Sequence, residues 1–273
     1  MYEQFFGFKE KPFSVTPDTK YFFPSEKHEE ALNTLLFGIL ERKGFAVLTG
    51  EVGSGKTTVW HALLNKLIRG TKVALITNSH LTSKQMIMAI LDEFEVPFKD
   101  WWPKIKMLNA LNRFLLEQIT LGFNVVVVID EAQNLSASVL EEVRMLSNLE
   151  TEREKLLQIV LIGQPELKSI LELKELRQLR QRVAVYYHIR PFTQEEMQKY
   201  IQHRLKIAGT NGHQVFDDSA LDKIYAHSGG IPRLVNSICD RALLTGFIKE
   251  RKEIDATIIE EVTKEIDELI IHM

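Results

Sequence analysis

The chain has 273 residues, of which 45% are hydrophobic and 26% are charged, and 34 Lys and Arg against 37 Asp and Glu leave a formal charge of −3. This composition excludes a disordered chain and argues against indiscriminate nucleic-acid binding, and the length fits one large or two modest domains. The single cysteine, Cys239, excludes an intrachain disulfide, and we expect it to be a small buried hydrophobic residue.

The N-terminal 24 residues are rich in aromatic residues and proline, which predicts a packed, irregular lead. We expect Phe8, Phe13 and Phe23 to pack onto the core; contact with an adenine or with a neighbouring subunit is the alternative. The first residues lack the basic and apolar parts of a signal peptide, and no apolar run in the chain could span a bilayer. We therefore expect a cytoplasmic protein with no integral membrane segment.

A first helix is expected at about 26–42, with Ser25 as its N-cap. Apolar strands and helices then alternate. The expected strands are 45–49, 72–77, 124–130, 156–163 and 183–189, and the helices between them end near Arg69, Phe94, Thr120 and Leu149. Such strands predict an α/β fold, a parallel sheet covered by helices on both faces in three layers. Trp101 and Trp102 interrupt this pattern, either as a partner contact or packed on the adjacent helix.

No strand is expected after Pro191. Thr193 to Glu196 form a capping box that predicts a helix ending near Gly209. Three more helices are expected to begin at Asp217 or Asp218, at Pro232 and at Asp255. The sequence therefore predicts an α/β core with its aromatic lead at 1–190 and a small all-helical lid domain at 191–273.

The strongest motif is a glycine-rich turn between a buried strand and a helix. It matches GxxxxGK[ST] and comprises Gly50, Glu51, Val52, Gly53, Ser54, Gly55, Lys56 and Thr57, followed by Thr58. The glycines let successive backbone N–H groups point at phosphate oxygens, Lys56 can reach the β- and γ-phosphates, and Thr57 can offer its hydroxyl to Mg²⁺. The motif predicts binding of ATP with Mg²⁺.

A second motif is the pair of acids that follows the apolar strand at 125–129. Ligands bind at the carboxyl ends of parallel strands, so Asp130 is expected to hold Mg²⁺ and Glu131 to polarise the attacking water. An Asp-Glu pair after a phosphate loop resembles the additional-strand class of P-loop proteins, to which the AAA+ ATPases belong. In that class another strand, here 156–164, is inserted between the strands that carry the two motifs.

The AAA+ resemblance implies three further site residues. Gln164 would sense the γ-phosphate from the end of the inserted strand, and Arg233, after Gly229-Gly230-Ile231-Pro232, would reach the nucleotide from the lid. An arginine of the basic segment 174–190 would act on a neighbouring subunit's nucleotide. Arg182 is the first candidate, ahead of Arg180 and Arg177; a solvated basic face or a nucleic-acid contact is the alternative.

Nearly the whole chain resembles the ExeA-type, or general secretion pathway protein A, family of AAA+ ATPases. The stretches that carry the resemblance are Phe6-Gly7-Phe8, Pro12-Phe13-Ser14, Pro17-Asp18, 45–58, 129–135, 163–167, 200–205 with Ala208-Gly209, and 229–236. Longer members continue into a membrane span and a peptidoglycan-binding module; this sequence shows neither, so direct cell-wall binding is not expected.

The resemblance implies an oligomeric ATPase, a ring or a helical filament with shared active sites, that uses ATP and Mg²⁺. It would assemble or regulate an envelope, secretion or pilus machine, with recruitment to the inner membrane by a partner protein left open. An ATP-dependent DNA-binding regulator of transposition is the alternative, because related ATPases act there. A nucleotide-gated scaffold that hydrolyses ATP slowly is the third reading.

Overall fold

The computed structural model describes residues 1–14, 19–67, 70–151, 154–210 and 214–271. Pro17 and Asp18 of the family resemblance, and Arg69 at the expected end of a helix, lie outside these ranges. Contacts within the chain divide it into two compact units. The sheet unit comprises Glu26–Gly50 and Val59–Ile189, and the helical unit comprises Met1–Ser25, Glu51–Thr58 and Arg190–Met273.

Five parallel strands form the sheet unit's centre, in the order β2-β3-β4-β1-β5. They are β1 (Phe45–Gly50), β2 (Thr71–Ile76), β3 (Asn124–Ile129), β4 (Gln158–Gly163) and β5 (Val183–Ile189). The expected strands and the parallel sheet are confirmed. So is the inserted strand, because β4 lies between β1, which leads into the phosphate loop, and β3, which precedes the two acids. The carboxyl ends of these three strands therefore share one edge of the sheet.

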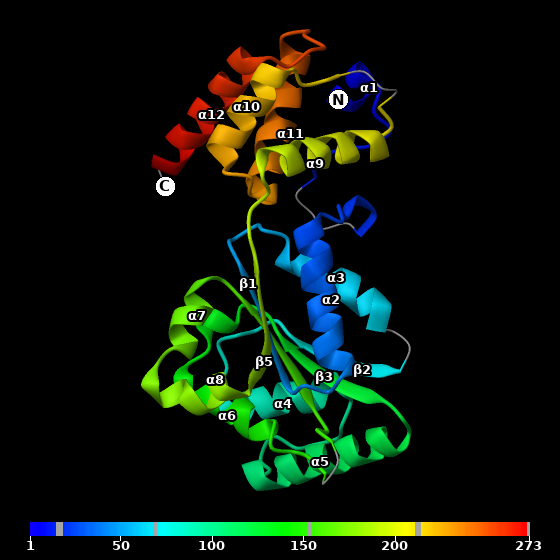
Figure 1. Ribbon diagram of the computed structural model, residues 1–273, viewed down its shortest axis with the longest axis vertical. Coiled ribbons are helices and arrows are strands. Elements are labelled where there is room, and N and C mark those ends of the chain that lie inside the picture. Colours follow the sequence, from blue (N-terminus) through cyan, green and yellow to red (C-terminus); the bar gives the residue numbers. More distant parts are fainter. Residues whose placement is uncertain (15–18, 68–69, 152–153, 211–213, 272–273) are drawn as a thin grey trace. The chain divides into compact units, whose positions relative to one another are not determined.

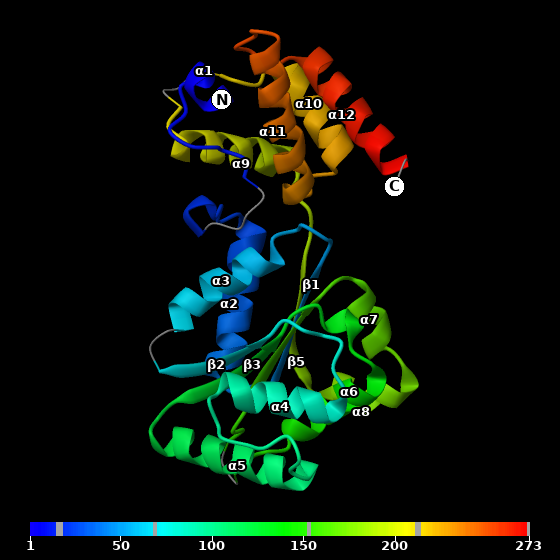
Figure 2. The same ribbon diagram turned by 180° about the vertical axis from the view of Figure 1, so that it is seen from behind.

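Helices cover both faces of this sheet (Figures 1 and 2). They are α2 (Glu26–Leu40), α3 (Lys56–Leu67), α4 (Ser83–Glu93), α5 (Lys104–Thr120), α6 (Ala137–Leu146), α7 (Glu166–Leu171) and α8 (Arg177–Arg182), with 3₁₀ turns η2 (Ala132–Asn134) and η3 (Lys174–Leu176). Alternate residues of β3 point to opposite faces. Val125, Val127 and Ile129 pack with α4 to α8. Val126 and Val128 pack with α2 and α3.

The two short helices α7 and α8 were not among the expected elements. Each spans six residues, which is less than two turns and too short for a helical repeat of apolar residues to emerge. Tertiary packing explains them. Leu167, Leu171 and Leu179 are buried in the core on the face of the sheet that α4 to α8 cover.

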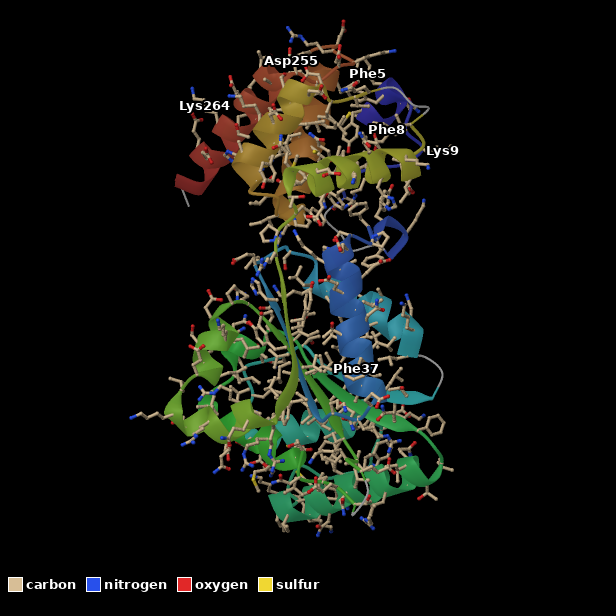
Figure 3. All side chains as sticks on the ribbon, in the orientation of Figure 1. Phe5, Phe8, Lys9, Phe37, Asp255 and Lys264 are labelled. Carbon is tan, nitrogen blue, oxygen red and sulfur yellow. The ribbon has the colours of Figure 1, made fainter. Side chains whose placement is uncertain are left out.

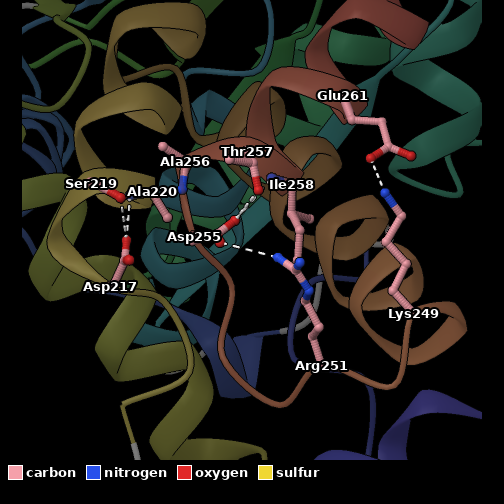
Figure 4. Close-up of polar contacts among 10 residues, drawn as sticks. All are labelled: Asp217, Ser219, Ala220, Lys249, Arg251, Asp255, Ala256, Thr257, Ile258 and Glu261. Carbon is pink, nitrogen blue, oxygen red and sulfur yellow. Dashed lines mark hydrogen bonds and ion pairs between the residues drawn. The ribbon is translucent and has the colours of Figure 1, made fainter.

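The helical unit contains α1 (Tyr2–Phe6), η1 (Thr19–Tyr21), α9 (Gln194–Ile207), α10 (Asp218–Ser228), α11 (Pro232–Ile248) and α12 (Ala256–Ile271). The four expected C-terminal helices are confirmed, as are their start signals. Thr193 and Glu196 form a capping box, and Pro232 occupies the first turn of α11. Asp217 and Asp255 accept hydrogen bonds from the first turns of α10 and α12 (Figure 4).

The aromatic lead packs with the C-terminal helices, which differs from the expectation that it would belong to the sheet domain of 1–190. Phe8 and Phe13 are buried among residues of α9 to α12, and the Lys9 backbone N–H donates to the Ala208 carbonyl at 2.8 Å. Figure 3 labels Phe5, Phe8 and Lys9 on this segment. The lead packs there because its rings join the same apolar cluster as the buried side chains of these helices.

Three other expectations concern single side chains. Cys239 is fully buried and free, as expected. Trp101 is 72% exposed, whereas Trp102 is half-buried against the core, with the Lys106 ammonium 4.1 Å from its ring centre. Among the described residues, no helix combines the length and the apolarity that a membrane crossing requires.

Candidate functional site

Gly50 ends β1 in the sheet unit, and the other phosphate-loop residues, 51–58, belong to the helical unit. Gly53 and Gly55 have φ angles of 80° and 96°, in the left-handed region that favours glycine. The Ser54 N–H donates to the Glu51 carbonyl at 3.0 Å, and α3 begins at Lys56. A glycine turn that ends at a helix N-terminus directs backbone N–H groups toward one point, which makes it an anion site.

Lys56 and Thr57 present the charged and hydroxyl groups of this loop. Lys56 is only 7% exposed, and its ammonium donates to the Glu51 carbonyl at 3.0 Å. Thr57 follows it on α3, and its side chain is exposed. A lysine ammonium beside a glycine turn at a helix N-terminus is the group that binds the β- and γ-phosphates in P-loop proteins, so the loop's chemistry fits a nucleotide's phosphates.

Arg233 lies against the phosphate loop. Its backbone N–H donates to the Gly53 carbonyl at 3.2 Å, and a Cβ on Gly53 would stand 2.4 Å from the Cβ of Arg233. Pro232 begins α11 one residue earlier, and the Arg233 side chain is exposed. The structure thus places Arg233, the expected lid arginine, in backbone contact with the phosphate loop.

The second group of candidates lies at the carboxyl ends of β3 and β4 in the sheet unit. The Asp130 backbone N–H donates to the Ile76 carbonyl at 2.9 Å, and its carboxylate accepts the Glu131 N–H at 2.9 Å. Glu131 has a left-handed backbone, with φ 50° and ψ 38°. Both carboxylates are half-exposed, so they can meet a ligand at the strand ends.

Gln164 is joined to Glu131, and a residue that sequence reasoning gave no role completes the group. The Gln164 side-chain amide donates to Glu131 Oε2 at 3.1 Å. Gln133 donates to the same oxygen at 2.5 Å, and its Oε1 accepts the Gln164 backbone N–H at 3.0 Å. Gln133 stands in the segment that carried the family resemblance, two residues after Glu131, and that position was the available signal.

The three arginines of the basic segment are not gathered at this group. The guanidinium of Arg182 donates to Ser147 Oγ at 3.1 Å. Arg180 donates to the Glu172 carbonyl at 3.2 Å. Arg177 is exposed, and within the described parts of the chain its side chain makes no hydrogen bond or ion pair. The pKa of Glu150 is lowered, first by its bond to Lys155 and in smaller part by the charge of Arg182.

Two of the candidate residues carry oxygen donors suited to a metal ion. The Thr57 hydroxyl in the helical unit and the Asp130 carboxylate in the sheet unit are each hard donors of the kind Mg²⁺ accepts while it keeps waters and phosphate oxygens as other ligands. Across the described residues, no group of three or more His, Cys, Asp or Glu side chains could hold a metal by itself. The residues fit a cation that arrives with phosphate.

Comparison with known proteins identifies a family and a relative. Residues 39–171 match a family described as the AAA domain. The chain is 46% identical over 250 residues to general secretion pathway protein A of Aeromonas hydrophila. That match covers 91% of this chain and 45% of the relative, so the chain spans less than half the length of the relative.

Solved structures share the fold at low identity. The Cdc6p protein of Pyrobaculum aerophilum is similar with a TM-score of 0.70 and 21% identity, over 92% of this chain and 72% of that one. A Drosophila ORC structure bound to DNA gives a TM-score of 0.71 at 16% identity, over 97% and 65%. The RuvB Holliday junction branch migration motor of Thermotoga maritima gives 0.57 at 18%, over 86% and 68%.

Proposed function

The chain is a P-loop ATPase of the AAA class, related to general secretion pathway protein A, and from this premise we propose that it uses ATP-dependent self-association to assemble or regulate a protein machine of the cell envelope. The observation that carries the ATPase part is the pairing of a left-handed glycine loop after β1 with an Asp-Glu pair after β3, with β4 inserted between those strands. The 46% identity to a secretion-pathway protein supports the envelope role.

Each site residue has a role in this proposal. Glycines and backbone N–H groups of residues 50–55, with Lys56 and Thr58, bind the phosphates. Thr57 and Asp130 would hold Mg²⁺, which neutralises charge on the β- and γ-phosphates. Glu131 accepts a proton from the attacking water. Gln164 donates to the γ-phosphate, and Arg233 joins the lid to the phosphates.

Substitutions of Lys56 and Glu131 test ATP binding and ATP hydrolysis separately. We expect Lys56→Ala to abolish ATP binding, because the loop loses its only side-chain cation toward the phosphates. Glu131→Gln should bind ATP normally and turn it over at least 100-fold more slowly, since general-base catalysis contributes on this scale. Lys66→Ala, at the exposed end of the same helix α3, is the matched control and should behave as wild type. Wild-type turnover in Glu131→Gln would exclude Glu131 as the base.

Self-association is tested by light scattering with the ATP-trapping variant. Glu131→Gln with ATP and Mg²⁺ should give a larger particle than the same protein with ADP, because bound ATP would be shared between subunits. One particle mass under both conditions would contradict ATP-dependent assembly. Tight binding with little hydrolysis by the wild type would favour the slow scaffold instead.

DNA binding is the second candidate function, and the exposed side chains of Lys174, Arg177 and Arg180 favour it. It predicts ATP-dependent binding to duplex DNA that weakens steeply with salt, because phosphate contacts release counterions. The envelope role predicts no ATP-dependent DNA binding. A salt titration with and without ATP therefore separates the two.

An arginine acting between subunits is the last part of the proposal. Arg182, the first candidate from sequence, is bound to Ser147 within its own chain, whereas the freedom and exposure of Arg177 support it over Arg182. In a mixing experiment, Arg177→Ala subunits should regain turnover beside Glu131→Gln subunits, which still supply the arginine. Rescue of Arg182→Ala but not Arg177→Ala would restore Arg182 as the donor.

A further inference from the structure

Gln133 uses both ends of its side-chain amide at the proposed catalytic group. Its Nε2 donates to Glu131 Oε2 at 2.5 Å, and its Oε1 accepts the backbone N–H of Gln164 at 3.0 Å. The opposite orientation of the amide would place a carbonyl oxygen against a carboxylate oxygen, so the network fixes which end is which. Gln133 therefore ties the Glu131 side chain to the backbone at the end of β4.

Two backbone features make room for this tie. Glu131 adopts the left-handed conformation, which costs a non-glycine residue about 1–2 kcal/mol and turns the chain into η2, where Gln133 stands. On the other side, a Cβ on Gly163 would come within 2.8 Å of Gln133 Oε1 and 2.9 Å of Leu167 Cδ2. A side chain at position 163 would push the Gln133 amide away from the Gln164 N–H.

The same carboxylate oxygen also accepts the side-chain amide of Gln164, at 3.1 Å. In the proposed function this amide is the group that donates to the γ-phosphate. If it turned to the phosphate, Glu131 would lose one of these two amide donors. The bond from Gln133 does not depend on that amide, because Gln133 is held by the Gln164 backbone.

We propose that Gln133 is a positioning residue for ATP hydrolysis, which holds the carboxylate of Glu131 in one orientation while the side chain of Gln164 engages the γ-phosphate. The inference rests on the proposed role of Glu131 as the base. Loss of the hydrogen bond from Gln133 removes one restraint on the Glu131 carboxylate, and an orientation that points elsewhere is unproductive for proton transfer from the water. The effect falls on turnover, because Gln133 has no part in the phosphate loop.

Two substitutions of Gln133 separate positioning from a structural role. Gln133→Leu removes both hydrogen bonds at similar size, whereas Gln133→Glu keeps an acceptor for the Gln164 N–H and removes the donor to Glu131. We expect kcat to fall about tenfold or more in both variants, with the Kd for ATP within about twofold of wild type. If Gln133 only braces the end of β4, Gln133→Glu keeps the wild-type kcat, and the inference is overturned.

A double-mutant cycle tests whether Gln133 acts through Glu131. Single-turnover hydrolysis of radiolabelled ATP is measured for Gln133→Leu, for Glu131→Gln and for the double variant. If Gln133 acts only through the carboxylate, the double variant is no slower than Glu131→Gln alone. An equal, independent loss in both backgrounds would overturn the inference. Wild-type turnover in Glu131→Gln would instead overturn the proposed function on which it rests.

Gly163→Ala approaches the same tie from the other side and leaves Gln133 intact. The new methyl group should displace the Gln133 amide, so kcat should fall in wild-type background and not fall further in the Gln133→Leu background. Because Gly163→Ala leaves Gln133 in place, its effect on kcat still tests the inference if Gln133→Leu lowers the melting temperature. Equal losses from Gly163→Ala in both backgrounds would count against the inference.

Discussion

The polar groups of the two units make different kinds of contact. In the sheet unit, Glu131, Gln133 and Gln164 lie half-buried at the strand ends and are hydrogen-bonded to one another. In the helical unit, hydrogen bonds join segments that are far apart in sequence: the Arg204 guanidinium donates to the Pro12 carbonyl, and the Arg233 backbone N–H donates to the Gly53 carbonyl.

This difference gives a rule that experiments can break. Changes at the strand ends of the sheet unit should alter turnover while leaving the folded state intact. Changes to the ties of the helical unit should alter stability or nucleotide affinity while leaving kcat at saturating ATP unchanged. A melting curve, a Kd for ATP and a kcat should therefore be measured on the same variant.

The largest effect is expected at Arg204, a 5% exposed arginine on α9. Its guanidinium donates to the Pro12 carbonyl at 2.7 Å, to the Tyr200 hydroxyl at 2.7 Å and to the Ser14 carbonyl at 3.4 Å, and it lies 4.6 Å from the Tyr21 ring centre. Arg204→Met would leave the buried Pro12 carbonyl without this donor. We expect a loss of about 3 kcal/mol in the free energy of unfolding.

Lys199 on the same helix is the matched control for that variant. It pairs with Glu195 at 2.6 Å, and both side chains are exposed, so Lys199→Met should leave the free energy of unfolding close to that of wild type. Neither change should alter kcat of the folded protein. A lowered kcat in Arg204→Met at a temperature where it is fully folded would show that the lead takes part in turnover, and the rule would fail.

An intermediate effect is expected at Gly53, where the phosphate loop meets α11. Gly53→Ala combines a φ of 80° with a methyl group 2.4 Å from the Cβ of Arg233. We expect about 2 kcal/mol against the loop conformation that binds ATP, which is about a 30-fold higher Kd, with kcat at saturation retained. Gly122 has a φ of 82° and no heavy atom within 4 Å of its Cβ position, so Gly122→Ala isolates the backbone strain and should leave the Kd unchanged. An unchanged Kd in Gly53→Ala would show that the contact with α11 does not shape the loop.

Sequence patterns predicted the elements whose signals are local. Apolar runs identified all five strands, and start signals at Thr193, Asp217, Pro232 and Asp255 identified the C-terminal helices. The prediction assigned the aromatic lead to the wrong unit, because aromatic composition indicates that a segment is buried but not which surface it packs against. The tie through Gln133 could not be predicted, since it depends on a left-handed residue and on a glycine from another strand, which only the folded sheet brings together.

The smallest effect is expected at Asp255, which caps α12 and accepts from the Thr257 hydroxyl, the Ile258 N–H and the Arg251 guanidinium (Figure 4). The pKa of Asp255 is lowered, mainly by the Thr257 hydrogen bond, with smaller contributions from the Ile258 N–H and the charge of Arg251. Because the pKa of Asp255 in the folded protein lies below its ordinary value, the stabilising contribution of its charge is complete above about pH 4 and is lost as the pH falls through the lowered pKa.

Asp255→Ala should lower the free energy of unfolding by about 1 kcal/mol near neutral pH, and this difference from wild type should shrink in acid. Asp255→Asn keeps a capping oxygen that does not titrate, so its difference from Asp255→Ala should stay constant with pH. A pH-independent difference between wild type and Asp255→Ala would show that the charge of Asp255 contributes nothing to the cap.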